Sequence, residues 1–213
     1  TNLAQMRQVN DWSASMNHWP HLSFGGLYLN ADVTEIISEV VRIKSLGLYG
    51  IKLHPEYQEF SPLESRLAPV WAAAAEQGLP VLFHAGSDIG FYGQPQHSRP
   101  GDFAELAARH PELKIICAHM GGWRNWDAVE AELCGAPVYL DTSFSKAWMG
   151  DQGQFERIIR KHGVQRILYG TDSPWNDLAD GIREIQECSL TDEEKELIFW
   201  GNAAGLLNLP EPS

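Results

Sequence analysis

The chain alternates between short apolar runs and longer stretches in which apolar residues recur with helical spacing. The apolar runs are four to six residues long and continuous in character, as is typical of parallel strands buried on both faces. We therefore predict strands within six segments, at residues 24–29, 48–53, 80–83, 113–118, 137–140 and 166–169.

Helical periodicity fills the intervals between these runs and occupies both ends of the chain. Gly47, Gly78 and Gly163 follow three of these stretches, and Thr191 with Glu194 forms a capping box at the start of another. The predicted helices span residues 3–16, 33–46, 63–77, 101–109, 125–133, 154–162, 178–187 and 192–207. Six βα units with connections too long for hairpins predict a parallel α/β architecture, which a closed barrel and an open doubly wound sheet both satisfy.

The domain organisation follows from the same alternation. No linker, low-complexity segment or further repeat interrupts it, so residues 1–213 are expected to form a single domain. Neither a GxGxxG motif nor a GxxxxGKS or GxxxxGKT motif occurs, so the usual sequence support for nucleotide binding is missing.

The charge balance is strongly acidic, with a formal net charge of −12 over 213 residues. Such a chain repels phosphate backbones and anionic lipids, which argues against nucleic acid and membrane partners. No apolar run approaches the roughly 20 residues that cross a bilayer, and the first residues lack the apolar region of a signal peptide. We therefore expect a soluble, cytoplasmic protein. The wide spacing of Cys117, Cys134 and Cys188 predicts neither a disulfide framework nor a cysteine zinc site.

Polar groups follow five of the six apolar runs. They are His54, His84, His119, Asp141 and Asp172. In a parallel barrel the carboxyl ends of all strands open on one face, so groups far apart in the sequence converge there. Imidazole and carboxylate are the usual ligands of first-row divalent metals, and a charge at a strand end costs little where it faces a cation. A metal in such a site lowers the pKa of its bound water toward about 7, which suits hydrolysis or a related polar bond cleavage.

The side chains around this group leave alternatives open. Lys52 lies inside an apolar run, where it either faces a carboxylate or substrate in the barrel mouth or extends its ammonium group to solvent. Asp141 either supports the ligands or caps its strand, and His54 either joins the site or holds the loop that follows it. Trp123 either lines a pocket for a flat substrate or packs in the core. The five remaining histidines are expected to be solvated, and these are His18, His21, His97, His110 and His162.

Five short motifs occur in order along the chain. They are Lys-Leu-His-Pro at 52–55, Phe-His-Ala-Gly at 83–86, Ala-His-Met-Gly-Gly at 118–122, Tyr-Gly-Thr-Asp-Ser-Pro at 169–174 and Gly-Asn-Ala-Ala-Gly-Leu-Leu at 201–207. In this order they resemble the amidohydrolase-related family (amidohydrolase family 2) of metal-dependent TIM-barrel enzymes. The run His-Pro-Glu-Tyr-Gln at 54–58 is similar to a short, mostly uncharacterised bacterial branch of that family. The resemblance implies a TIM (β/α)8-type barrel, of which about six βα units, strands 3 to 8, are present.

The resemblance also implies roles for individual residues. His84 is expected as the strand 5 metal ligand, His119 as the strand 6 histidine that ligates the metal or assists the reaction, and Asp172 as the strand 8 aspartate, a ligand that orients or deprotonates the water. Lys52 lies near the lysine that is carbamylated in relatives with two metals. Zinc is the expected metal, with manganese as an alternative, and a homodimer is implied.

The expected activity is hydrolysis of a small ester, lactone or amide by metal-activated water. One alternative is a metal-dependent non-oxidative decarboxylase of an aromatic or unsaturated carboxylic acid, which needs a basic residue such as Arg99 or Arg124 to hold the carboxylate. Another is a binding protein without catalytic activity.

One departure from the family stands out. Its members begin with a His-x-His pair on strand 1, and no such pair occurs in this chain. A barrel of about 250 residues uses roughly 31 residues per βα unit, so the first two units are expected to be absent here. Either a longer parent protein supplies the pair, which we expect, or the chain is a variant with an incomplete site.

Overall fold

Five parallel strands lie side by side in the order in which they occur along the chain. The computed structural model describes residues 2–91 and 93–210. The strands are β1 (Ile51–Leu53), β2 (Val81–Phe83), β3 (Ile115–Cys117), β4 (Tyr139–Asp141) and β5 (Ile167–Leu168). Each strand is joined to the next by a connection that contains at least one helix, and every pairing is parallel. This arrangement is that of one part of a (β/α)-barrel wall.

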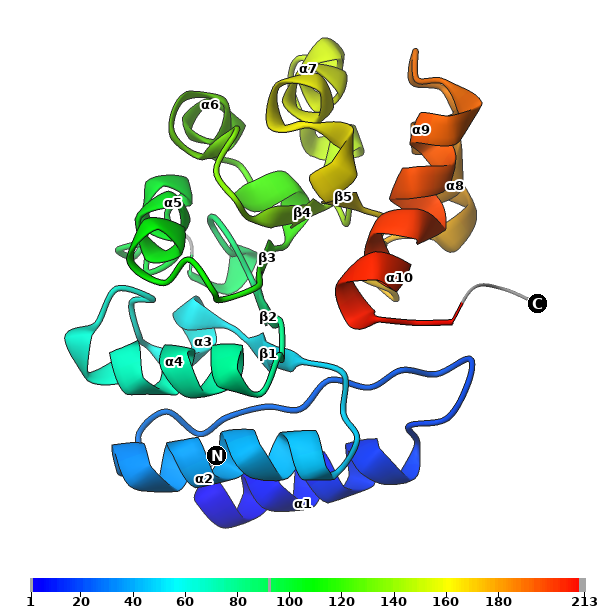
Figure 1. Cartoon of the computed structure of the whole chain (residues 1–213). Coiled ribbons are helices and arrows are strands. Elements are labelled where there is room, and N and C mark those ends of the chain that lie inside the picture. The colour runs from blue at the N-terminus through cyan, green and yellow to red at the C-terminus, as the bar shows by residue number, and fades with distance from the viewer. Residues whose placement is uncertain (1, 92, 211–213) are drawn as a thin grey trace.

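The helices that connect the strands lie along the outer side of the curved sheet (Figure 1). The helices are α1 (Leu3–Ser15), α2 (Val33–Ser45), α3 (Pro55–Gln58), α4 (Ala68–Glu76), α5 (Pro100–Arg109), α6 (Trp126–Ala128), α7 (Gln152–His162), α8 (Leu178–Gln186), α9 (Asp192–Glu196) and α10 (Asn202–Leu207). A π-helical turn at Val129–Leu133 extends α6, and another at Leu197–Gly201 joins α9 to α10. The capping box of Thr191 and Glu194 is confirmed at the start of α9. None of the helices in the described part of the chain combines the length and apolar character that a membrane crossing requires.

The two faces of the sheet have different surroundings, because successive residues of a strand point to opposite faces. Ile51 and Leu53 of β1 belong to the main core between the sheet and the outer helices. Lys52 lies between them and pairs in register with Leu82 of β2, which in turn pairs with Ile116 of β3. These residues line the inner face, where Ile116 packs in a small apolar cluster that includes α10. The predicted partial barrel is therefore confirmed, and the open doubly wound alternative is wrong.

The strand predicted at residues 24–29, the first of the six, is wrong. Within the described residues this segment forms a single parallel bridge, between Gly25 and Ile51. The side chain of Asn10 takes both backbone groups of Gly26, since its Oδ1 accepts from the amide at 2.8 Å and its Nδ2 donates to the carbonyl at 3.0 Å. The ladder with β1 stops after this bridge because the side chain of Gln58 accepts from the amide of His54 and donates to the carbonyl of Leu27, both at 2.8 Å, so those two groups do not bond to each other. Glycine also weakens a strand. The expected six βα units appear as five strands and one bridging residue.

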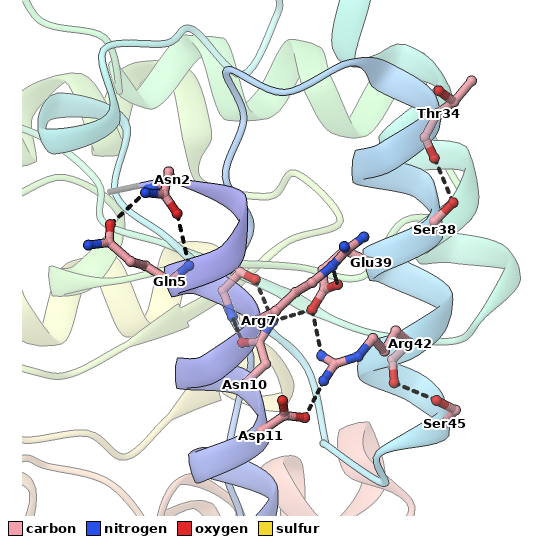
Figure 2. Close-up of polar contacts among 11 residues, drawn as sticks. Asn2, Gln5, Arg7, Asn10, Asp11, Thr34, Ser38, Glu39, Arg42 and Ser45 are labelled. Carbon is pink, nitrogen blue, oxygen red and sulfur yellow. Dashed lines mark hydrogen bonds and ion pairs between the residues drawn. The ribbon is translucent and has the colours of Figure 1, made fainter.

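Asn10 belongs to a polar network between α1 and α2 (Figure 2). Glu39 of α2 is 1% exposed, and its carboxylate accepts from Asn10 at 2.8 Å, from Arg7 at 3.0 Å and from Arg42 at 2.9 Å. A buried carboxylate is tolerated where cations and donors surround it in this way. The network ties α1 to α2, and through Gly26 it holds the segment beside β1 in place.

Candidate active site

A cavity of about 490 Å³ opens at the carboxyl ends of the strands. It is lined by six residues that the sequence singles out, which are Lys52, His54, His84, His119, Trp123 and Asp172. Residues that sequence reasoning did not select also line it, among them Tyr57, Ser87, Asp88, Ile89 and Phe144. The convergence follows from the parallel topology, because each strand delivers its next residues to the same end of the sheet.

His84 and His119 form the centre of the site. Each directly or almost directly follows a strand, and each is 6% exposed. The Nδ1 atom of His84 lies 3.1 Å from the Nε2 atom of His119. Two further contacts hold the rings, since the Nε2 of His84 lies 3.1 Å from the carbonyl of Ser87 and the Nδ1 of His119 lies 3.2 Å from the carbonyl of Ser143.

These partners assign the protons on the two rings. A carbonyl oxygen only accepts hydrogen bonds, so the nitrogen that faces it carries the proton. His84 is therefore protonated on Nε2 and His119 on Nδ1, which leaves a lone pair on each of the two nitrogens that face each other. Two lone pairs 3.1 Å apart repel, unless a cation is shared between them. A separation near 3 Å is also that of two adjacent nitrogen ligands with metal bonds of about 2.0–2.1 Å.

The protonation states of the site suit a metal ion. Burial is the main cause that lowers the pKa of His84 to about 2, and the nearby His54, His119 and Lys52 contribute in the same direction. Burial likewise lowers the pKa of His54 to about 4, with Lys52 as the next cause, while Asp88 acts in the opposite direction. Neutral imidazole is the form that binds metals, so these two rings need not lose a proton at neutral pH.

His54 stacks on His84, with the ring centroids 4.1 Å apart and the planes at 9°. Its Nδ1 accepts from the backbone amide of Tyr57 at 3.3 Å, so its proton lies on Nε2, which is 3.4 Å from the Oδ2 of Asp88. The same Oδ2 atom lies 4.0 Å from the Nε2 of His84. Asp88 is the carboxylate that sequence reasoning missed, and its place four residues after a strand-end histidine was the available indication.

Two positions for a divalent ion can be compared. Among the described residues, His54, His84 and Asp88 offer three ligand atoms within 4.8 Å of one another. An ion bound there through the Nε2 atoms would require His54 and His84 to carry their protons on Nδ1, and the contacts of Nε2 with Asp88 and Ser87 would be lost. The lone pairs of His84 and His119 require no such change. The donor set therefore fits a divalent ion best between His84 and His119, with His54 and Asp88 supporting the rings from behind.

Lys52 and Asp172 line the same cavity, and they belong to opposite edges of the sheet, since Lys52 lies in β1 and Asp172 follows β5. Asp172 is exposed at the mouth and has a left-handed backbone, with φ at 61°. It does not belong to the three-residue ligand group found in the described part of the chain. Surrounding protein atoms raise its pKa, while His119 and Lys52 lower it. Its predicted roles as ligand and catalyst remain predictions.

Lys52 lies in the middle of β1, and its exposed side chain is on the face opposite the core residues Ile51 and Leu53. Among the described residues it forms no ion pair within 4.0 Å. Protein atoms around the ammonium group lower its pKa, while the charges of Asp141 and Asp172 raise it. A cation in this position is available to an anionic ligand.

Aromatic rings form one wall of the cavity. Trp123 is 5% exposed and its ring lies 6.2 Å from that of Phe144, at an angle of 24°. Arg124 lies over the ring of Trp123, with 4.9 Å between its Cζ atom and the ring centroid. Arg99, the other arginine considered for carboxylate binding, pairs instead with Asp102 at 3.1 Å. The wall suits a flat, apolar ring.

Similarity to known proteins agrees with this arrangement. A family model described as amidohydrolase matches residues 4–209 of the chain. The chain belongs to the amidohydrolase family. A curated relative from Polaromonas sp. (strain JS666 / ATCC BAA-500), gamma-resorcylate decarboxylase, is 26% identical over 160 residues, which cover 67% of this chain. The chain spans 44% of the length of that relative.

Solved structures resemble this chain over nearly its whole length. 5-Carboxyvanillate decarboxylase from Sphingomonas paucimobilis matches with a TM-score of 0.75 at 18% identity, over 97% of this chain and 73% of that one. A dihydroxybenzoic acid decarboxylase from Polaromonas sp. JS666, with bound manganese and the inhibitor 2-nitroresorcinol, matches with a TM-score of 0.72 at 19% identity, over 96% and 75%. At these identities the likeness establishes the fold. The family model thus confirms the family expected from the sequence, and the solved structures confirm the barrel.

Proposed function

We propose that this chain carries the larger part of the active site of a metal-dependent, non-oxidative decarboxylase of an aromatic carboxylic acid. The observation that carries the proposal is that Lys52 lines the same cavity as His84 and His119. Lys52 has no ion pair among the described residues, and the lone pairs of the two histidines converge. A carboxylate is the ligand that suits both groups at once. The aromatic wall of Trp123 and Phe144 suits the ring that bears it.

The metal ion would be held by His84 and His119, with Asp172 at the mouth as a further ligand or as the acid. When bound, it supplies a positive centre that orients the substrate and stabilises negative charge on its oxygens. Manganese occurs in a similar solved structure, and nothing specifically favours zinc. The choice of metal is therefore left to the experiment below.

The chain's own residues carry the remaining steps. Lys52 holds the carboxylate of the substrate. Trp123 and Phe144 fix the plane of the substrate ring, so that the bond from the ring to its carboxylate points away from this aromatic wall. Asp172 donates a proton to the ring carbon that bears the carboxylate. The carbon–carbon bond then breaks, its electron pair remains with the ring, and carbon dioxide leaves. The ring gains one proton and loses carbon dioxide, and the negative charge of the carboxylate passes to Asp172, so no oxidant is needed.

The hydrolase expected from the sequence would use the same residues. No observation at the site favours water attack on an ester, lactone or amide over decarboxylation, and the similar proteins are described as decarboxylases. We therefore propose the decarboxylase in its place. A protein that only binds its ligand is the outcome to expect if no carbon dioxide is released.

The test is to incubate the purified protein with manganese or zinc and a panel of hydroxybenzoates and carboxyvanillates, while product and carbon dioxide are measured. We expect release of carbon dioxide that chelation abolishes and that Asp172→Asn lowers by at least 100-fold. Asp180→Asn is the matched control, because Asp180 is exposed on α8 and pairs with Arg183. Hydrolysis of esters or lactones without decarboxylation, or full activity in Asp172→Asn, would overturn the proposal.

A further inference from the structure

Asp141 is the hub of a hydrogen-bond cluster behind His119. Its Oδ1 atom accepts from the backbone amide of His119 at 3.0 Å, from the backbone amide of Ser143 at 3.0 Å and from the hydroxyl of Ser143. The same hydroxyl oxygen lies 3.0 Å from the Nδ1 of His119. Asp141 itself is not among the residues that line the cavity.

The cluster has one consistent assignment of protons. The hydroxyl of Ser143 has a single proton, and it donates that proton to the carboxylate of Asp141, which only accepts. The hydroxyl oxygen must therefore accept from His119, whose Nδ1 carries the proton. The carbonyl of Ser143, 3.2 Å from the same nitrogen, requires the same assignment. The Nε2 of His119 is left with its lone pair directed at the cavity.

The backbone of His119 needs support as well. His119 and Met120 are both left-handed, with φ at 59° and 51°, a conformation that non-glycine residues seldom adopt. Asp141 holds the amide of His119, and the indole of Trp126 donates to its carbonyl at 3.1 Å. The peptide is thus held on both sides, so the ring of His119 starts from a fixed position.

We propose that Asp141 is a positioning residue that, through the hydroxyl of Ser143, keeps His119 in the Nδ1-protonated form with Nε2 free to bind a divalent ion. The inference rests on the proposed function in one respect, namely that His119 faces a metal. Groups that orient a metal-binding histidine in this way typically change metal affinity by 10–100-fold when they are removed. The alternative role, in which Asp141 only caps β4, predicts no effect on the ring of His119.

The test uses two measurements on the intact chain. The first is the ring ¹⁵N NMR spectrum of the metal-free protein, which distinguishes the two neutral forms of each histidine, with His119→Gln to assign the signal. The second is the affinity for zinc and for manganese by titration calorimetry. Ser143→Ala removes the link and leaves the backbone carbonyl, and Asp141→Asn removes the charge. Ser38→Ala is the control, because it removes the same hydroxyl group from an exposed serine of α2, where it bonds to the carbonyl of Thr34.

We expect the Nδ1-protonated form at His119 in the wild-type chain, and ring signals shifted toward the other form in both variants. We expect about a tenfold or greater loss of metal affinity in Ser143→Ala, and less than a twofold change in Ser38→Ala. An Nε2-protonated His119 in the wild type would overturn the inference, and so would a Ser143→Ala protein that binds metal as the wild type does. Should Asp141→Asn fail to fold, Ser143→Ala decides alone.

The inference and the proposed function fail in different ways. A wild-type chain that shows the Nδ1-protonated form but binds no metal contradicts the proposed function and the metal-binding half of the inference. A chain that binds metal and decarboxylates its substrate, with His119 unaffected by Ser143→Ala, contradicts the inference alone.

Discussion

The imidazole rings of His54 and His84 are stacked 4.1 Å apart, yet their lone pairs face different partners. The lone pair of His84 on Nδ1 faces His119, whereas the lone pair of His54 is used by the backbone amide of Tyr57. Of these two rings, only that of His84 therefore has a lone pair left to offer a metal ion.

This difference predicts the result of replacing each ring. His54→Phe keeps an aromatic ring against His84 and loses no metal-facing lone pair, so we expect metal affinity within about threefold of the wild type. His84→Phe is the matched variant and is expected to abolish measurable binding, because it removes a ligand. Titration calorimetry with zinc measures both. Equal losses in the two variants would show instead that the ion binds among His54, His84 and Asp88.

Replacement of Lys52 tests how the substrate is held. Lys52→Met keeps most of the apolar stem and removes the ammonium group, which has no ion-pair partner among the described residues. A hydrogen bond to a charged group contributes about 1.5–3 kcal/mol, so we expect KM for the aromatic acid to rise about 10–100-fold. Metal content by mass spectrometry is expected to stay unchanged. An unchanged KM would show that the carboxylate is held elsewhere, with Arg124 as the next residue to replace.

The regular part of this architecture could be predicted from the sequence because it depends on local patterns. Apolar runs identified all five strands to within a few residues, and the ends of the helices followed from glycines and from the capping box at Thr191. The prediction of a strand at 24–29 failed because the side chain of Gln58, in α3, binds the backbone groups of Leu27 and His54 that would have extended the pairing with β1. No local pattern contains that contact.

The residues of the site likewise fall into those that the sequence predicts and those that it does not. His84 and His119 were predicted because they follow strands, and topology alone brings strand ends together. Asp88 and Ser143 were missed because they lie in loops, whose course is determined by tertiary contacts. His162 was expected in solvent and is 2% exposed, a wrong prediction made from its place at a helix end.

The network around Glu39 predicts a stability effect away from the cavity. Asn10→Ala removes both hydrogen bonds to Gly26 and one to Glu39, and leaves buried polar groups without partners. Each such group costs about 1–3 kcal/mol, so we expect the free energy of unfolding to fall by at least about 2 kcal/mol. Urea unfolding followed by circular dichroism measures it. Ser45→Ala is the control, since its hydroxyl bonds at the helix surface and a change within about 0.5 kcal/mol is expected. Equal midpoints for the two variants would contradict the role assigned to Asn10.

His162 predicts how stability changes with pH. Its Nδ1 faces the amide of Gly135 at 3.3 Å and its Nε2 donates to the carbonyl of Val138 at 2.8 Å, so the buried ring is neutral. Burial lowers its pKa to about 4, against an ordinary value of about 6.5 in the unfolded chain. Between these values the unfolded chain takes up a proton that the folded chain does not, so stability is complete above about pH 6.5 and falls as the pH drops toward 4.

The size of this effect follows from the slope of about 1.4 kcal/mol per pH unit, which gives a loss of about 2 kcal/mol by pH 5. His162→Gln keeps a side chain that donates and accepts but does not titrate, so its stability lacks this component. Urea unfolding of both proteins at pH 7 and pH 5 isolates it, because the other histidines are common to both. We expect the stability advantage of the wild type over His162→Gln to shrink by about 2 kcal/mol at the lower pH. An advantage that stays constant would mean that His162 binds its proton equally in the folded and unfolded chains.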